Sequence, residues 1–151
     1  MSGIIVGVDG SGHSQRALEW AMKEAAIRHA PLTVLTVHNA VKNMYGGVSL
    51  YPDDPIRTEE TRKLAQAETD KVLATLAEPR PESVVVKAVH GFPADELINA
   101  GKDADLLVLG SRGAGGFSRL LVGSVAGQVT QHAQCPVVII PPEDGGEVQS
   151  R

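Results

Sequence analysis

The chain has 151 residues, of which 42% are hydrophobic and 21% are charged, and this length and composition predict a single globular domain with its own core. The net charge of −4, with no basic run, argues against nucleic-acid binding, and the single cysteine, Cys135, excludes an internal disulfide. No apolar stretch is long enough to span a bilayer and no signal-peptide pattern begins the chain, so we expect a cytoplasmic protein with no membrane partner.

Short apolar runs bounded by turn residues predict five buried strands, at residues 4–8, 32–37, 84–89, 106–109 and 136–140. Helical patterns lie between them, one from Ser14 as N-cap and the others at residues 57–77, 94–100 and 124–132. In the second helix, four residues are expected to face the core: Leu64, Val72, Leu73 and Leu76. Residues 39–55 show no firm period and are expected to form a long, mobile connection. Residues 1–142 are thus one expected domain, followed by a polar tail, 143–151, that we expect to be disordered.

Strands that alternate with helices predict an α/β fold, with a mainly parallel sheet and helices on both faces. Such sheets bind ligands at the carboxyl ends of their strands, where the strand order reverses. Asp9 ends the first predicted strand, and a carboxylate there suits ribose hydroxyls if the first and fourth strands are neighbours. The alternative is that Asp9 is only a turn or cap residue before Gly10.

Two glycine signals near the C-terminus predict a phosphate cradle. Gly110 and Gly113 follow the fourth strand, and after nine intervening residues Gly123 and Ser124 open the last helix. The glycines would let the backbone come close to a ligand. A helix N-terminus offers unpaired N–H groups and the positive end of a dipole, which together favour an anion. Arg112 and Arg119 can add positive charge, and Ser124 can add a hydroxyl donor.

The sequence lacks residues that other ligand-binding and catalytic motifs require. Gly101-Lys102 lacks the earlier glycine of a Walker A loop, and Gln15 stands where a dinucleotide fingerprint needs glycine. The five histidines show no metal-ligand spacing. His38 and His90 stand at the ends of predicted strands. A histidine in such a position is more often an ordinary strand-end residue than a catalytic one. We therefore expect neither a catalytic residue nor a metal ligand.

Several segments together resemble the universal stress protein family. They are residues 6–11, the Gly91-x-Pro93 turn, residues 104–113, residues 123–125 and residues 135–138. The most diagnostic element is Gly-x2-Gly-x9-Gly-Ser, present as Gly110, Gly113, Gly123 and Ser124, which marks the ATP-binding branch of that family. The resemblance implies a Rossmann-like, open five-stranded parallel sheet in the order 3-2-1-4-5, a homodimer and a role in stress adaptation.

The resemblance also implies a set of binding residues. Asp9 would hold the ribose with Val8 beside it, and the backbone of Val37 and His38 would meet the adenine. The phosphate region would comprise Gly110, Arg112, Gly113, Gly123, Ser124 and Val125. One departure is that many relatives have a His-Val or similar pair where this chain has Val37-His38-Asn39. Backbone contact with adenine survives this difference, whereas a side-chain role for His38 does not follow.

Two classes of function remain open, a nucleotide-binding regulator and a nucleotide-dependent enzyme. An ATPase or transferase needs a base or a metal-binding carboxylate beside the γ-phosphate. Asp9 is the only candidate in the predicted crevice, so the sequence favours binding, with at most weak hydrolysis. The expected ligand is ATP, with Mg²⁺ or Mn²⁺ held mainly by its phosphates. AMP or cyclic AMP would use the same cradle.

The last predicted strand, from Pro136 to Ile140, is strongly apolar and lies at a sheet edge in the implied strand order. An uncovered apolar edge favours aggregation, and proteins normally cover it or pair it. Antiparallel pairing with the same strand of a second copy is self-complementary under two-fold symmetry. We therefore expect a homodimer through this strand.

Overall fold

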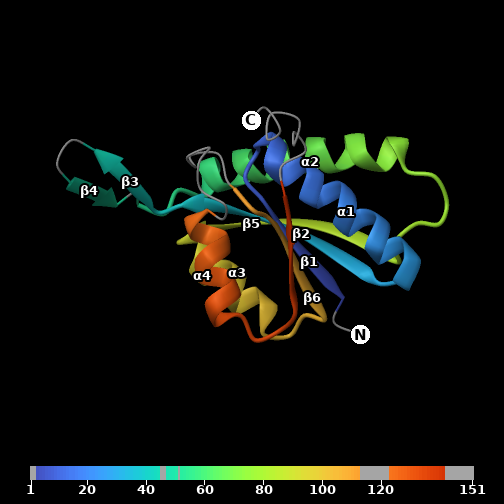
Figure 1. The fold of residues 1–151 in the computed structure, drawn as a ribbon. Helices are drawn as coiled ribbons and strands as arrows, with labels where there is room; N and C mark the ends of the chain where they lie inside the picture. Colours follow the sequence, from blue (N-terminus) through green and yellow to red (C-terminus); the bar gives the residue numbers. More distant parts are fainter. Residues whose placement is uncertain (1–2, 45–46, 51, 113–122, 142–151) are drawn as a thin grey trace, which may run out of the picture.

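The computed structural model describes residues 3–44, 47–50, 52–112 and 123–141, and the side chains of 41–51 are not described. One sheet holds five parallel strands: β1 (Ile4–Val8), β2 (Pro31–Asn39), β5 (Ser83–Gly91), β6 (Leu106–Gly110) and β7 (Val137–Ile140). Their order is β5-β2-β1-β6-β7 (Figure 1). Counted among these strands alone, this is the predicted order 3-2-1-4-5, so the fold prediction is confirmed. The predicted tail, 143–151, lies outside the described residues.

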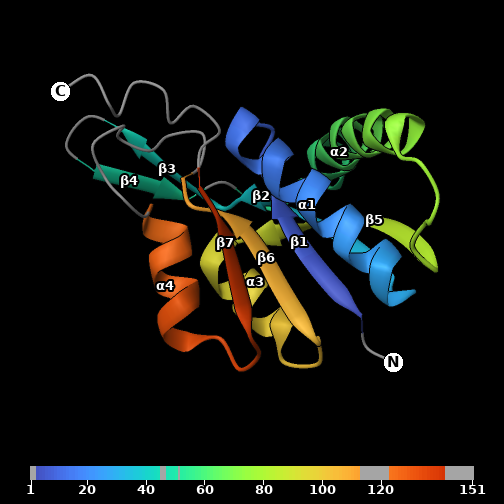
Figure 2. The same ribbon diagram turned by 45° about the vertical axis from the view of Figure 1, so that its right-hand side comes forward.

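Helices cover both faces of the sheet. They are α1 (Gly12–Arg28), α2 (Pro55–Thr75), α3 (Pro93–Gly101) and α4 (Ser124–His132). Figures 1 and 2 show α1 and α2 on one face and α3 and α4 on the other. The helix that follows β1 therefore lies on the opposite face from the helix that follows β6, and the sheet changes winding direction between these two neighbouring strands.

Two apolar cores, one on each face, hold the layers together. The core against α1 and α2 includes Ile4, Val6, Val8, Leu18 and Met22. The core against α3 and α4 includes Leu35, Leu97, Leu107, Leu109 and Val129. Because strand side chains alternate between faces, both cores draw on the same strands. Full burial of each large aliphatic side chain contributes roughly 1.5–3 kcal/mol, so the central strands are the most firmly held part of the sheet.

Three helices, α1, α2 and, by one residue, α3, begin earlier than the sequence pattern predicted. Ser11, rather than Ser14, is the N-cap of α1, and its Oγ accepts a hydrogen bond from the Ser14 N–H at 3.2 Å. The prediction was wrong because Ser11 and Ser14 both have cap chemistry, and only Ser11 has the extended backbone of a cap. Asp54 is the N-cap of α2, with Pro55 in the first turn. The predicted start of α4 at Ser124 is correct.

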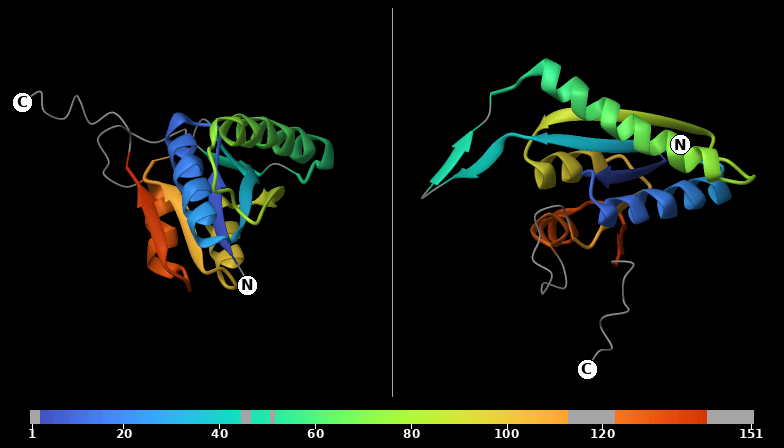
Figure 3. Two further views of the ribbon diagram at one scale, coloured as in Figure 1. Left: turned by 90° about the vertical axis from the view of Figure 1, so that its right-hand side faces the viewer. Right: turned by 90° about the horizontal axis from the view of Figure 1, so that it is seen from above.

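The segment predicted to be a mobile connection contains a hairpin. β2 continues to Asn39, and β3 (Val41–Met44) then pairs antiparallel with β4 (Gly47–Leu50). Figure 3 shows this hairpin extending away from the five-stranded sheet. Its sequence signal was the Gly46-Gly47 dipeptide, which is typical of a tight turn between two short strands.

Gly127 gives a direct test of the packing of α4. A Cβ at this position would meet no described atom within 4 Å. Replacing Gly127 with alanine should therefore stabilise the protein by about 0.5–1 kcal/mol, because alanine loses less conformational freedom in a helix. The measurement is the free energy of unfolding in urea.

Gly7 is the matched control, because a Cβ there would lie 2.8 Å from Cδ2 of both Leu97 and Leu109. Gly7→Ala should destabilise the protein by about 1–3 kcal/mol, the usual cost of overpacking a core. A loss of stability in Gly127→Ala would contradict the open packing of α4.

Candidate functional site

The candidate site lies where the winding of the sheet reverses, at the carboxyl ends of β1 and β6. β1 is the central strand and pairs in parallel with β2 on one side and β6 on the other. The chain leaves β1 toward α1 on one face and leaves β6 toward α4 on the other. A crevice at this position is where ligands bind in sheets of this kind.

A short turn after β1 is organised by Asp9. Its Oδ1 accepts hydrogen bonds from the Ser11 N–H at 3.0 Å and from the Ser11 hydroxyl at 2.6 Å. The Asp9 N–H donates to Ser14 Oγ at 3.2 Å, and Gly10 has a φ of +85° that favours glycine. The structure therefore gives Asp9 the turn role that the sequence left open. Its role as a ribose ligand stays a prediction, and the two roles are compatible because Asp9 is exposed.

Gly110 approaches protein backbone. A Cβ at Gly110 would lie 2.9 Å from the carbonyl oxygen of His13, in the first turn of α1. The absence of a side chain thus lets the end of β6 pack against the start of α1. The glycine at this position is thus required by packing within the protein, and a phosphate contact of the Gly110 backbone stays a prediction.

Backbone hydrogen bonds bring the start of α4 to the end of β6. The Gly123 N–H donates to the Ser111 carbonyl oxygen, and the Ser111 N–H donates to the Ile140 carbonyl oxygen at 2.9 Å. Gly123 is buried and is the N-cap of α4, with no side-chain hydrogen bond to the first turn. The N–H groups of Ser124 and Val125 lie in that first turn, so this helix end favours an anion.

The rest of the predicted phosphate region is only partly described. Arg112 follows β6 and is half-buried, and Ser124 is exposed. Gly113 and Arg119 lie outside the described residues. The structure therefore brings Gly110, Gly123 and the start of α4 together at one end of the sheet, and it does not address Gly113.

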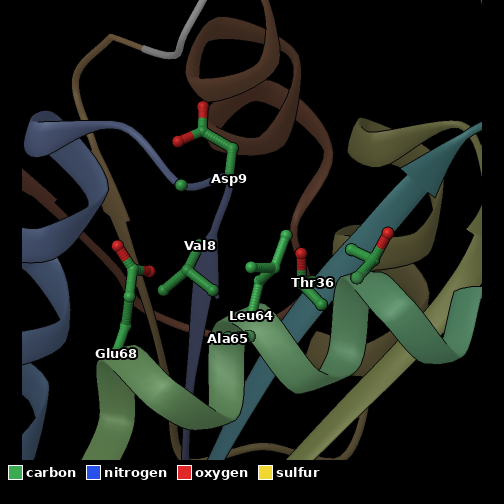
Figure 4. A pocket seen from close by; sticks show the side chains of 8 residues that line it. Val8, Asp9, Thr36, Leu64, Ala65 and Glu68 are labelled. Atoms are coloured by element: carbon green, nitrogen blue, oxygen red, sulfur yellow. The ribbon is translucent and has the colours of Figure 1, made fainter. Parts of the chain in front are cut away.

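A pocket of about 240 Å³ opens beside Asp9, between the ends of β1 and β2 and the helix α2. Its lining residues are Val8, Asp9, Gly10, Thr36, Thr61, Leu64, Ala65 and Glu68. Figure 4 shows Val8 in the middle, with Glu68 on one side, Leu64 and Thr36 on the other, and Asp9 at the end of β1. The walls are apolar, the polar groups are hydroxyls and carboxylates, and none of these described lining residues is Lys or Arg.

Glu68 is a pocket residue that sequence reasoning missed. Burial raises the pKa of its carboxyl, the negative charge of Asp9 raises it further, and Lys71 opposes these effects. The sequence signal was its spacing, because Glu68 follows Leu64 by four residues and Ala65 by three and so shares their side of α2.

Leu64 was expected to face the core, and that expectation was wrong, because its side chain is 72% exposed. The buried positions of α2 are Ala65, Thr69 and Val72, which leaves Leu64 beside them at the pocket. The predicted inward position of Val72 is correct, and Leu73 and Leu76 are partly buried against the same core.

The two predicted residues at the end of β2 lie beside the pocket and do not line it. Thr36 lines the pocket, so strand alternation directs Val37 to the opposite face of the sheet. His38 shares the face of Thr36, and its Nδ1 lies 3.3 Å from Thr58 Oγ1 of α2. Its ring also makes an edge contact with His90, at 5.4 Å between ring centroids. The Val37 side chain does not line this pocket, so its predicted backbone contact with adenine stays a prediction.

The described residues contain neither a cluster of metal-ligating side chains nor a helix that could cross a membrane. Among residues 3–44, 47–50, 52–112 and 123–141, no three His, Cys, Asp or Glu side chains are grouped as a metal site. No helix in the same ranges is long and apolar enough to cross a bilayer.

Comparison with known proteins identifies the family of this chain. Residues 1–141 match the Universal stress protein family. The chain belongs to this family. A universal stress protein of Mycobacterium tuberculosis is 34% identical over 144 residues, which cover 94% of this chain and 48% of that protein. This chain therefore spans about half the length of that universal stress protein.

Two solved structures of universal stress proteins are similar to this chain in fold. Universal stress protein UspA from Lactobacillus plantarum has a TM-score of 0.68 and 28% identity, with 92% of this chain and 97% of that chain covered. The universal stress protein from Archaeoglobus fulgidus in complex with dAMP has a TM-score of 0.59 and 27% identity, with 93% and 98% covered. The resemblance read from the sequence motifs is thereby confirmed.

The raised pKa of Glu68 predicts a pH-dependent stability difference. The folded state disfavours the ionised carboxyl, so the stability associated with Glu68 is fully present below the unfolded pKa of about 4.3 and is lost as pH rises through the higher folded pKa. Glu68→Gln should therefore be more stable than the wild type at pH 7, and this gain should shrink toward pH 4. Urea midpoints at both pH values measure it.

Glu60→Gln is the matched control, because Glu60 lies on the same helix and is exposed. It makes the same chemical change away from the pocket, and we expect no comparable gain at pH 7. Equal midpoints for Glu68→Gln and wild type at both pH values would show that the folded pKa of Glu68 is not raised.

Proposed function

We propose that this universal stress protein binds ATP and acts as a nucleotide-dependent regulator in the stress response, with Mg²⁺ or Mn²⁺ held mainly by the ATP phosphates. The main support is one juxtaposition at the switch point of the sheet. An acidic and apolar pocket lies on the β2 side of Asp9, and a helix N-terminus without a side-chain cap lies beyond β6. A nucleotide has the matching division into a neutral nucleoside and an anionic phosphate chain.

The chemistry of the two regions supports one direction for the proposed nucleotide. The pocket carries the carboxylates of Asp9 and Glu68, which would repel phosphate at short range. Its apolar walls and hydroxyl groups suit a purine base and a ribose. The first-turn N–H groups of α4 suit phosphate oxygens, and Arg112 follows the last residue of β6 by two positions. We therefore place the nucleoside in the pocket and the phosphates toward α4.

The same arrangement favours binding over hydrolysis. ATP hydrolysis needs a base or a metal-binding carboxylate beside the γ-phosphate. Asp9 Oδ1 already accepts two hydrogen bonds from Ser11, and Glu68 lies in the pocket assigned to the nucleoside. Neither carboxylate of the described pocket is therefore placed as a base for water at the far end of the phosphates.

The relative from Archaeoglobus fulgidus supports the choice of an adenine nucleotide. That protein is described in complex with dAMP and is 27% identical to this chain over nearly its whole length. An adenine nucleotide in the same fold is consistent with the size and polarity of the pocket here.

Calorimetric titration of the purified, ligand-stripped protein tests the proposal. ATP should bind more tightly than GTP, in keeping with the adenine nucleotide bound by the relative from Archaeoglobus fulgidus. Cyclic AMP and AMP form the comparison arm for the phosphate chain, since either would use fewer donors at α4. The proposal fails if no ATP binding is detected in the presence of Mg²⁺.

In the same titration, Asp9→Asn separates the two roles of Asp9. The asparagine Oδ1 can still accept from Ser11, so the turn is kept while the charge is lost. ATP binding should weaken by about 1–3 kcal/mol, the usual effect of losing a hydrogen bond to a charged group. Unchanged affinity would leave Asp9 with its turn role alone.

We further propose a homodimer through β7, which is an edge strand of the sheet. The Leu107 N–H donates to the Pro136 carbonyl oxygen and the Ser111 N–H donates to the Ile140 carbonyl oxygen. Even-numbered residues of this strand thus face β6, and in a parallel ladder the backbone groups of Val137 and Ile139 face the free edge. Antiparallel pairing of two copies would satisfy those groups.

Ile139→Pro tests this dimer, because it removes an outward N–H and leaves the hydrogen bonds to β6 in place. The variant should be monomeric by light scattering at micromolar concentration. Ile139→Ala controls for the loss of the partly buried side chain and should remain a dimer. A monomeric wild type would refute the proposal.

A further inference from the structure

Glu68 enters the pocket from the middle of α2, away from both glycine motifs. Figure 4 shows its carboxylate directed toward the space beside Val8 and beneath Asp9, on the opposite side of Val8 from Thr36. Glu68 and Asp9 line the same cavity and influence each other electrostatically. They approach it from different elements, one from α2 and the other from the end of β1.

The carboxylate of Glu68 has hydrogen-bonding capacity that the described residues do not use. Within the described part of the chain, no residue donates a hydrogen bond to it, although it is partly buried. An ionised carboxylate can only accept hydrogen bonds, so a ligand that satisfies Glu68 must supply donors. Asp9 Oδ1 already accepts two hydrogen bonds from Ser11, which limits what Asp9 alone can offer a ligand.

The hydrogen-bond donors of a nucleotide indicate which part of it could bind the Glu68 carboxylate. Phosphates carry none and would be repelled by two carboxylates. The base is expected toward the end of β2, on the Thr36 side of Val8, whereas Glu68 lies on the other side. The remaining donors are the adjacent 2′ and 3′ hydroxyls of the ribose, next to Asp9.

We propose that Glu68 is a specificity-determining residue, and that its carboxylate and that of Asp9 together accept the hydrogen bonds of a ribose cis-diol. This inference rests on the nucleotide-binding function proposed above. It predicts a preference for ribonucleotides over nucleotides that lack one of the two hydroxyls. The relative in complex with dAMP holds a nucleotide without a 2′ hydroxyl, so the preference would be a property of this chain's α2.

The experiment compares ATP, 2′-deoxy-ATP and 3′-deoxy-ATP by calorimetry with wild type, Glu68→Gln, Glu68→Ala and the control Glu60→Gln. Wild type should bind ATP about tenfold more tightly than at least one deoxy analogue, as expected for a hydrogen bond to a charged group. Both Glu68 variants should reduce that ratio to about twofold by weakening ATP. Glu60→Gln should keep the wild-type ratio, because Glu60 does not line the pocket.

The outcomes separate this inference from the function on which it rests. If wild type binds ATP and both Glu68 variants keep the full discrimination, the inference is overturned and the nucleotide-binding function stands. Equal weakening of all three nucleotides in the Glu68 variants also overturns it, because Glu68 would then act on the base or on the shape of the pocket. If wild type binds none of the three nucleotides, the proposed function itself fails.

Discussion

The central position of β1 is the constraint on which the candidate site depends. Its residues pair with β2 along the whole strand and with β6 over its first half, and their side chains are shared between two apolar cores. Gly7 leaves room for Leu97 and Leu109 to pack against the strand, so little slack remains around it. The turn that carries Asp9 therefore begins at the end of the central strand, where Val8 pairs with Thr36 of β2.

Contacts that are almost entirely backbone then tie the other side of the site to this turn. Gly110 allows the end of β6 to lie against the His13 carbonyl oxygen. The backbone of Ser111 makes one hydrogen bond to Gly123 and another to Ile140 at the end of β7. The pocket by Asp9 and the first turn of α4 are consequently held in a fixed relation by the fold. Such preorganisation would lower the cost of binding the nucleotide proposed above, which spans both regions.

Much of the fold could be predicted from the sequence because its signals are local and mutually consistent. Short apolar runs between turn residues identified the strands, and Gly123-Ser124 correctly marked the start of α4. The start of α1 was misplaced because two serines compete as caps, and the chain alone does not reveal which has the extended backbone. The β3–β4 hairpin was missed because its strands are only four residues each, too short to show a period.

The meeting of strand-end residues at the candidate site was predictable from motifs, whereas the part of the pocket formed by α2 depends on packing. Asp9 and Gly110 stand next to strand ends in the sequence, so topology alone brings them to one edge. The position of Glu68 depends on how α2 rotates over the sheet, and the small residues Ala65 and Thr69 decide that rotation by packing inward. Leu64, the larger apolar residue, was the more natural choice for the core, and its exposure is what the sequence pattern could not anticipate.

The raised pKa of Glu68 gives a reason to associate the packing of α2 with function. A carboxylate whose pKa is raised by burial and by a like charge makes the folded state less stable at neutral pH than a neutral side chain would. A locally unfavourable residue beside a pocket is typical of binding sites, where the ligand supplies the missing interaction. The opposite case is Glu59, whose pKa is lowered by its hydrogen bond to Arg62 on the exposed side of the same helix. One helix thus carries a carboxylate with a hydrogen-bond donor on the same helix and another to which none of the described residues donates.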